Sequence, residues 1–255
     1  MKTFHVCTIA NDLRQYEEMK SSFISVGFDL DRCRYSLFDN SASNKFDPYQ
    51  IFNTIKSTTV EPYIIFCHQD VRMDRGDGIE HLLKLIDELN ASDDRWAIAG
   101  NAGINNHYQA VVRITDPNNT SNWGGDFPQS VHSLDENFLV IKTAATISSS
   151  TDLSGFHFYA TDLCLNAIIK KYTCYVINFH LTHLSGGSRE QTFWQAQSKF
   201  QDKWCNEFGF CYIQTITCVT MCLSKYKRLR TIGSHQKVMD WCLARFPFRP
   251  LFISS

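Results

Sequence analysis

The sequence contains no long apolar run, no Cys-x-x-Cys pair and no internal repeat or low-complexity segment. Because a transmembrane helix needs roughly 18 or more consecutive apolar residues, we expect no membrane span. Without a second cysteine pair near Cys218 and Cys222, a zinc site is not indicated, and the cysteines are predicted to be reduced, structural thiols. The start, MKTFHVCTIANDL, turns polar early, so we expect no signal peptide and a cytoplasmic location.

Neither sign of charge is in excess. Lys and Arg number 25, Asp and Glu number 26, and the formal net charge is −1. This balance argues against binding of nucleic acid through overall charge, and a hydrophobic share of 44% argues against disorder. A chain of 255 residues is long enough to bury a sizeable core in one large or two small domains.

Short apolar runs alternate with segments of helical periodicity. This alternation is typical of the α/β class, and it predicts a Rossmann-type, mostly parallel central sheet flanked by helices. The polar stretch 101–135 is predicted to be an inserted loop or a lid. The predicted strands are 4–10, 34–38, 63–67, 96–100, 138–141 and 174–179, and the predicted helices are 13–26, 49–56, 78–90, 163–171 and 193–204.

The apolar run 63–67 ends abruptly in His68, Gln69 and Asp70. Such a run is typical of a strand that is covered on both faces, and α/β proteins bind ligands outside the carboxyl ends of these strands. Two residues at i and i+2 of a strand face the same side, so His68 and Asp70 together suit a divalent cation. The same residues also fit an ordinary turn, and this stretch alone does not decide between the two.

The end of the chain is rich in cations and aromatic residues. This composition predicts either contact with an anionic membrane surface or a solvated helix face with its aromatic residues packed inward. We predict two domains, 1–204 as the main domain and 205–255 as a C-terminal helical extension packed on it. The cations are Lys225, Lys227, Arg228, Arg230, Lys237, Arg245 and Arg249 against only Asp240, and the aromatic residues include Tyr226, Trp241, Phe246 and Phe248.

The order of several motifs resembles a known enzyme family. The chain has strand ends at Asn11 and Asp39, and then the motifs HQDV at 68–71, WAIAGNAG at 96–103, LDENFLVIK at 134–142, FHFYATDLCLNA at 156–167 and HLSGGS at 183–188. Over residues 4–204 this order resembles the family 2-like glycosyltransferases of the GT-A fold. The resemblance implies a GT-A-like fold and transfer of a sugar from a nucleotide-sugar donor to a glycan or lipid-linked acceptor.

The resemblance also implies roles for individual residues. It implies an Mn²⁺ or Mg²⁺ site at Asp70 and His183, with His68 in the place of the family's usual first acid. It implies that Asp162 is the general base of an inverting reaction, because an acceptor hydroxyl must lose its proton as it attacks. Contacts to the nucleotide sugar are implied for Ala10, Asn11, Asp39, Gln69 and Asp70, and contacts to the sugar or acceptor for Trp123, Asp135 and Glu136.

Each of these residues also has a structural interpretation. His180 and His183 would face opposite sides of a continuous strand, so at most one should meet the site. Gly186 and Gly187 would let backbone amides approach a phosphate. Asp162 also fits the first turn of a helix, where a negative charge is favoured. Strand-end polar residues fit turns, and a lone tryptophan such as Trp123 is often a packing anchor.

Two other functions stay open from the sequence. A nucleotidyltransferase would use the same kind of sheet and metal carboxylate, but such enzymes usually carry a glycine-rich, basic loop after the first strand. The corresponding segment here, IANDLRQYEE, has no glycine. A non-catalytic sugar-binding or scaffold protein is the other alternative, because HQD departs from a pair of acids.

Overall fold

The computed structural model describes residues 2–117, 121–186, 191–217 and 219–249. Among the helices in these ranges, none combines the length and the apolarity needed to cross a bilayer. The helices are α1 (Leu13–Ser25), α2 (Pro48–Thr58), α3 (Ile79–Ser92), α4 (Tyr159–Ile169), α5 (Gln191–Phe208), α6 (Lys227–Gly233) and α7 (Gln236–Leu243). The strands are β1 (Phe4–Ala10), β2 (Cys33–Asp39), β3 (Tyr63–Cys67), β4 (Val71–Arg72), β5 (Trp96–Gly100), β6 (Ala102–Asn105), β7 (Ala110–Thr115), β8 (Ser121–Gly124), β9 (Gln129–Leu134), β10 (Phe138–Lys142), β11 (Thr173–Val176), β12 (Leu181–His183), β13 (Cys211–Gln214) and β14 (Thr220–Leu223).

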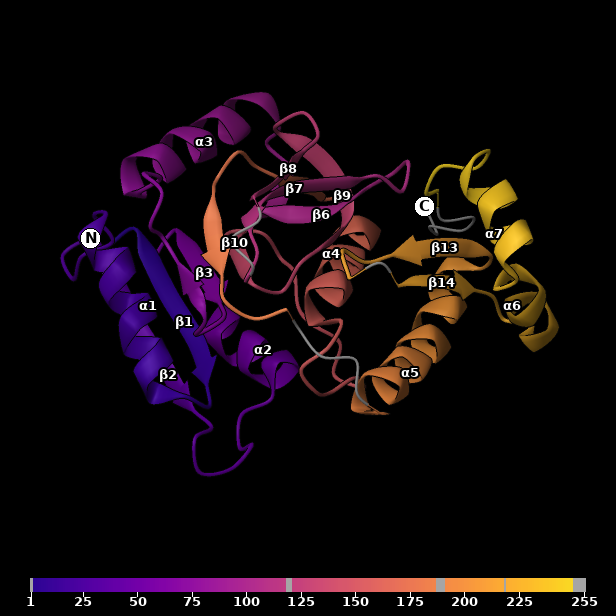
Figure 1. Cartoon of the computed structure of the whole chain (residues 1–255), viewed down its shortest axis with the longest axis horizontal. Coiled ribbons are helices and arrows are strands. Elements are labelled where there is room, and N and C mark those ends of the chain that lie inside the picture. The colour runs from indigo at the N-terminus through magenta and orange to yellow at the C-terminus, as the bar shows by residue number, and fades with distance from the viewer. Residues whose placement is uncertain (1, 118–120, 187–190, 218, 250–255) are drawn as a thin grey trace.

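One large sheet forms the centre of the molecule (Figure 1). Its strand order is β2-β1-β3-β10-β5-β11-β9-β6-β7-β12-β4, with β8 paired to β7. Helices α1 and α3 contribute to one hydrophobic core and helices α2, α4 and α5 to the other. The α/β prediction is therefore confirmed, and the sheet is buried between helices as the apolar runs indicated.

The prediction of a mostly parallel sheet is wrong, because the sheet is mixed, and its Rossmann-type detail stays a prediction. Strands β1, β2 and β3 are parallel as expected. Strand β10 then runs antiparallel to both β3 and β5, with Val140 opposite Ile65 on one side and Ala99 on the other. An apolar run reports that a strand is buried on both faces but carries no information on its direction, so the pattern could not distinguish the two arrangements.

The polar stretch 101–135 is not a lid, because it contains strands β6, β7, β8 and β9. Polar side chains of this stretch form hydrogen bonds that support the sheet. The Asn105 side chain accepts hydrogen bonds from the amides of His107 and Gln109 and thereby closes the β6–β7 turn. Ser133 on β9 donates to the carbonyl of Gln214. Satisfied polar groups in short strands look like loop residues in a sequence, which explains the wrong prediction.

Local signals begin α1 and α2 close to where the sequence indicated. The Asp12 side chain caps α1 by accepting from the amides of Arg14 and Gln15. Asp47 caps α2, whose first residue is Pro48. The described cysteines are free and buried. Cys218 and Gly187 lie outside the described residues.

The C-terminal part of the chain is not purely helical, contrary to the prediction. Helix α5 continues to Phe208, past the predicted boundary at 204, and is followed by the antiparallel β13–β14 hairpin before α6 and α7. In Figure 1 the hairpin, α6 and α7 lie at the outer right end of the molecule. Phe248 stacks on His132 of the large sheet at 4.5 Å between ring centroids, which ties this end to the main body. The division into two domains stays a prediction.

Candidate functional site

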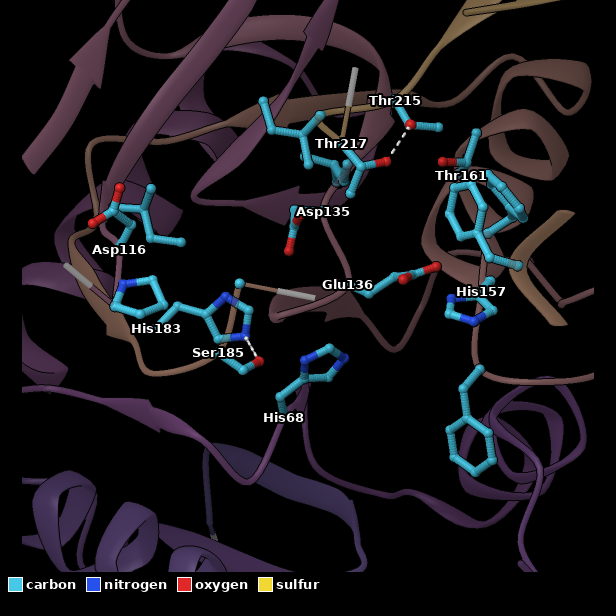
Figure 2. A pocket seen from close by; sticks show the side chains of 18 residues that line it. His68, Asp116, Asp135, Glu136, His157, Thr161, His183, Ser185, Thr215 and Thr217 are labelled. Carbon is cyan, nitrogen blue, oxygen red and sulfur yellow. Dashed lines mark hydrogen bonds between the residues drawn. The ribbon is translucent and has the colours of Figure 1, made fainter. Parts of the chain in front are cut away.

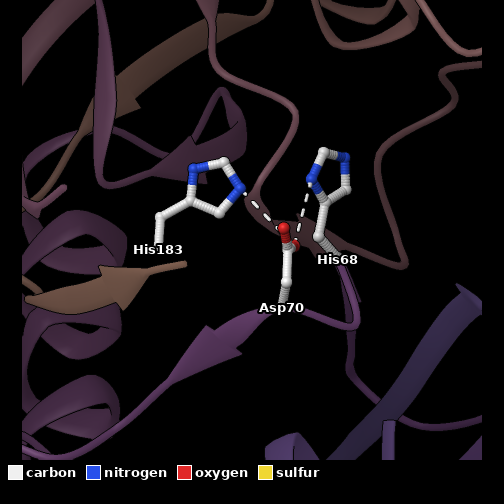
Figure 3. A group of neighbouring side chains, drawn as sticks. All are labelled: His68, Asp70 and His183. Atoms are coloured by element: carbon white, nitrogen blue, oxygen red, sulfur yellow. Dashed lines mark ion pairs between the residues drawn. The ribbon is translucent and has the colours of Figure 1, made fainter. Parts of the chain in front are cut away.

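Three of the predicted metal ligands meet in space (Figure 3). His183 Nε2 lies 3.5 Å and His68 Nδ1 lies 3.8 Å from the same oxygen, Oδ1 of Asp70. One ligand atom from each residue lies within 4.8 Å of the other two. This grouping confirms that the predicted residues lie together, whereas His180 bonds to Thr115 instead.

The sheet itself positions the triad. His68 and Asp70 occupy the corner between β3 and β4, and His183 ends β12. Strand β12 pairs with β4, with His183 opposite Val71. The amide of Leu184 donates to the carbonyl of Asp70 at 2.9 Å. The backbone pairing therefore holds the third ligand against the first two.

Hydrogen bonds around His68 determine which ring nitrogen carries its proton. The Tyr159 hydroxyl has one hydrogen, and it is donated to the carbonyl of Glu136 at 3.1 Å. The same hydroxyl must therefore accept from His68 Nε2, at 3.0 Å. Burial and the charge of His183 lower the pKa of His68, so the ring is neutral at neutral pH. Its Nδ1 consequently presents a lone pair to Asp70, as a metal-binding imidazole does.

The Asp70 carboxylate is ionised. Burial acts to raise its pKa, but the hydrogen bond and the charge of His183 outweigh burial and hold the pKa well below its usual range. For His183, burial acts to lower the pKa, and the hydrogen bond and charge of Asp70 reverse this and raise it. One carboxylate oxygen and two imidazole nitrogens suit Mn²⁺ better than Mg²⁺, which prefers oxygen ligands.

A cavity of about 400 Å³ opens beside the triad (Figure 2). His68 and His183 line one side of it. Asp135 and Glu136, which were predicted to touch sugar or acceptor, line another part, and the pair follows β9 directly. The other polar lining residues are Asp116, His157, Thr161, Ser185, Thr215 and Thr217.

Glu136 has the most perturbed carboxylate of the cavity wall. Burial, followed by the charge of Asp135, raises its pKa to about 8. The backbone amides of Phe158, Tyr159 and Ala160, at the start of α4, bond to this carboxylate and oppose the shift. In Figure 2 the Glu136 side chain extends toward His157 and Thr161. A buried carboxyl group with a pKa near neutrality can exchange a proton at physiological pH.

The structure does not bring Asp162 into this cavity. Its exposure is 0%, and its two carboxylate oxygens accept from the Ser150 amide, the Ser150 hydroxyl, Trp204 Nε1 and Asn166 Nδ2. Burial raises its pKa to about 6. Helix α4 begins at Tyr159, after Phe158 in the left-handed conformation, and therefore earlier than the predicted start at 163, and Asp162 faces the interior.

The predicted nucleotide-binding residues lie at one edge of the sheet but do not line the cavity. Ala10 and Asp39 are opposite each other at the ends of β1 and β2. Gln69 Oε1 accepts from the amides of Asn11 and Asp12 at 2.8 and 2.9 Å. This side chain therefore ties the turn before the triad to the end of β1. Gln69 therefore has a structural role. The Asn11 and Asp39 side chains are exposed.

Trp123 lies on β8, away from the cavity wall. The Arg113 guanidinium sits 3.5 Å from the centroid of its ring, and His180 meets the ring edge-on. The side chain is still 59% exposed. Tyr159, Thr215 and Thr217 were not predicted from the sequence to belong to the site. The two threonines lie in the β13–β14 turn, and no sequence signal connects that turn to the triad.

The Tyr159 hydroxyl contacts His68 at Nε2, the ring nitrogen that does not face Asp70, and the effect of this contact on metal binding can be tested. Tyr159→Phe removes the group that holds His68 in its metal-binding tautomer, and we expect Mn²⁺ affinity to fall by about 10- to 100-fold. Mn²⁺ titration followed by electron paramagnetic resonance measures this. Tyr49→Phe is the matched control, because that hydroxyl also donates to a backbone carbonyl, that of His157, but touches no triad residue. Equal affinities for the two variants would contradict the prediction.

Comparisons with known proteins support the fold and identify a relative. No family model matches the chain. Residues 1–349 of TarS from S. aureus, in complex with UDP-GlcNAc, superpose with a TM-score of 0.53 at 11% identity, covering 81% of this chain and 67% of that chain. A second TarS structure gives 0.50 at 12% identity, with 81% and 66% covered. TarS is a glycosyltransferase with a GT-A-like fold, and at this identity the likeness concerns the fold alone.

One curated protein is similar over most of its length. It is "ATP synthase subunits region ORF 6" of Fuscovulum blasticum, which is 31% identical over 221 residues, covering 84% of this chain and 88% of that protein. The chain therefore has a GT-A-like α/β fold and belongs to the same protein family as ATP synthase subunits region ORF 6 of Fuscovulum blasticum.

Proposed function

We propose that the protein is a metal-dependent glycosyltransferase that moves a sugar from a nucleotide-sugar donor to a hydroxyl of a glycan or lipid-linked acceptor, with inversion. One observation carries the proposal. An ionised Asp70, flanked by two imidazoles with suitably placed nitrogens, lies beside a polar cavity on a GT-A-like fold. We place the nucleotide at the sheet edge formed by Ala10, Asn11 and Asp39.

The triad would hold Mn²⁺. The bound ion supplies positive charge to the diphosphate that departs from the sugar. His68 is neutral and needs no proton loss before binding, whereas His183 Nε2 would give up to solvent the proton that it donates to Asp70. The neutral, Nε2-protonated form of His68 is maintained by Tyr159, and this form keeps the triad ready for a cation.

We propose that Glu136, and not Asp162, is the general base. Glu136 lines the cavity that the triad lines, whereas Asp162 is 0% exposed and does not line it. The acceptor hydroxyl would approach between Glu136 and the threonines of the β13–β14 turn. Glu136 would take its proton as the oxygen attacks the anomeric carbon, and a direct attack of this kind inverts that centre.

A donor panel tests the proposal. UDP-, GDP-, CDP- and dTDP-sugars are added with and without Mn²⁺, and thermal unfolding is followed. We expect UDP-sugars to stabilise the protein only with Mn²⁺, because TarS binds UDP-GlcNAc on a similar fold. A ligand at about 100 times its Kd adds about 2.7 kcal/mol, which for a domain of this size raises Tm by roughly 5–10 °C.

Two results would overturn the proposal. Stabilisation by every donor without metal would show that the triad takes no part in donor binding. No stabilisation by any donor would leave no nucleotide-sugar site. Binding without hydrolysis or transfer would instead favour the non-catalytic sugar-binding alternative, and hydrolysis of the UDP-sugar is the measurement that separates the two.

A further inference from the structure

The C-terminal end of the molecule carries an unusual concentration of exposed cations. Between residues 225 and 249 the chain has seven Lys and Arg residues and one acid, Asp240, although its overall net charge is −1. Arg230 is used internally, since it pairs with Asp202 and donates to Cys205. The other cations are exposed, and they are Lys225, Lys227, Arg228, Lys237, Arg245 and Arg249.

Large apolar side chains are exposed between these cations. Tyr226, which caps α6, and Leu229 and Ile232 within it are three residues apart, so they lie on one side of the helix, and they are 71%, 41% and 56% exposed. Trp241 on α7 and Phe246 just after it are 52% and 57% exposed. Side chains of this size rarely point into water together without a partner. We call these five apolar residues and the six exposed cations the C-terminal patch.

The second part of the patch borders an apolar cavity. Trp241 and Phe246 meet edge-to-face at 5.6 Å, and the Arg245 guanidinium lies 5.0 Å from the Trp241 ring centroid. These residues line a cavity of about 600 Å³ together with Phe210 and Tyr212. The rings are therefore positioned with an apolar hollow on one side and cations around them.

We infer that the C-terminal patch docks the protein on an anionic lipid bilayer. Aromatic and aliphatic side chains enter the boundary between headgroups and acyl chains, where tryptophan is favoured, and surrounding Lys and Arg bind the anionic headgroups. Nucleic acid would also attract the cations, but its phosphate backbone has no place for exposed Leu229, Ile232 and Phe246. The mixture of charge and apolar surface therefore favours a bilayer.

Docking would also orient the cavity beside the triad. The β13–β14 hairpin packs with α6, through contacts such as Tyr212 Oη donating to the Gly233 carbonyl at 2.8 Å. The turn of the same hairpin places Thr215 and Thr217 in the cavity wall. The surface that meets lipid and the wall of the cavity thus belong to one structural unit.

Sedimentation with lipid vesicles tests the inference without any donor or metal. At about 0.1 M salt we expect the full chain to bind phosphatidylcholine vesicles containing about 30 mol% phosphatidylglycerol and not pure phosphatidylcholine vesicles. Each basic residue near an anionic surface contributes roughly fivefold in affinity, so Lys225→Glu, Lys227→Glu and Arg228→Glu together should weaken binding by about 100-fold or more. The matched control is Lys45→Glu, Lys84→Glu and Lys199→Glu, which changes net charge equally elsewhere and should retain binding.

A second pair of variants tests the apolar part. Trp241→Ala with Phe246→Ala should weaken binding at least about tenfold, because two large side chains no longer enter the lipid. Trp194→Ala is the control, since Trp194 on α5 is 51% exposed but lies outside the patch. Thermal unfolding of each variant verifies its fold. Failure of the wild type to bind anionic vesicles, equal loss in both charge variants, or binding of a short DNA duplex in place of vesicles would overturn the inference.

Discussion

Asp70→Asn should lose Mn²⁺ binding and lower donor turnover by about 10³-fold. The substitution keeps the shape of the side chain and removes only the negative charge between the two imidazoles. A bound cation contributes several kcal/mol to stabilising the charge of the transition state, and each 1.36 kcal/mol is tenfold in rate. Mn²⁺ titration and UDP-sugar hydrolysis measure the two effects on the same sample.

The control for this variant is Asp94→Asn, which removes the same charge from an exposed position before β5. Its Mn²⁺ affinity and turnover should equal those of the wild type. Tyr159→Phe should fall between the two, because it perturbs only the tautomer of one ligand. Full Mn²⁺ affinity in folded Asp70→Asn would show that the triad is not the metal site.

Glu136→Gln should bind donor and Mn²⁺ normally and lose transfer to the acceptor by about 10²- to 10⁴-fold, the range typical of a removed general base. Glutamine has the same shape but cannot take the proton from the acceptor hydroxyl. The comparison is Asp162→Asn. There an amide replaces a buried carboxylate whose oxygens accept hydrogen bonds from the Ser150 amide and Trp204 Nε1. That variant should unfold more easily, yet turnover per folded molecule should change little.

The pH dependence provides a second readout. The base must be deprotonated, so with a pKa of about 8 for Glu136 the wild-type rate should rise between pH 6 and 9. Glu136→Gln should lack this rise. A group whose pKa is raised by folding stabilises the protein below its unfolded pKa and loses that contribution as pH passes the folded value. Glu136→Gln should therefore be no less stable than the wild type above pH 8, and a large loss of stability there would assign Glu136 a structural role.

Strand positions were predictable where burial alone determines them. The predicted strands at β1, β3 and β5 reproduce the observed bounds, because short, mostly apolar runs bounded by turn residues are typical of strands covered on both faces. The direction of β10 was not predictable, since an antiparallel strand with two buried faces has the same composition as a parallel one. Strands β6–β9 were missed because their polar groups are satisfied by partners distant in the chain.

The residues of the candidate site were likewise predictable only in part. His68 and Asp70 followed from the end of one strand, and the family resemblance added His183 and the pair Asp135–Glu136. The family resemblance also implied Asp162 as the base, and helix periodicity could not test this, because it does not say which face of α4 meets a cavity. That depends on where α4 begins, and the left-handed Phe158 that begins it leaves no signal in the sequence. Thr215 and Thr217 depend on a hairpin that packs back from the end of the chain.

The strand order of the sheet has a consequence for how the molecule assembles. Strand β4 follows β3 after only the corner that contains His68 and Asp70, yet it lies at the opposite end of the strand order, paired with β12 alone. The sheet must therefore curl until β4, the last strand in the order, comes back to β3, the third. The triad lies where these two strands meet. Among the described strands, β4 and β12 are the paired strands farthest apart in the sequence, so we expect this pairing to form late. A metal ion bound there would join the β3–β4 corner to the end of β12, and metal binding would therefore show that these distant segments have come together.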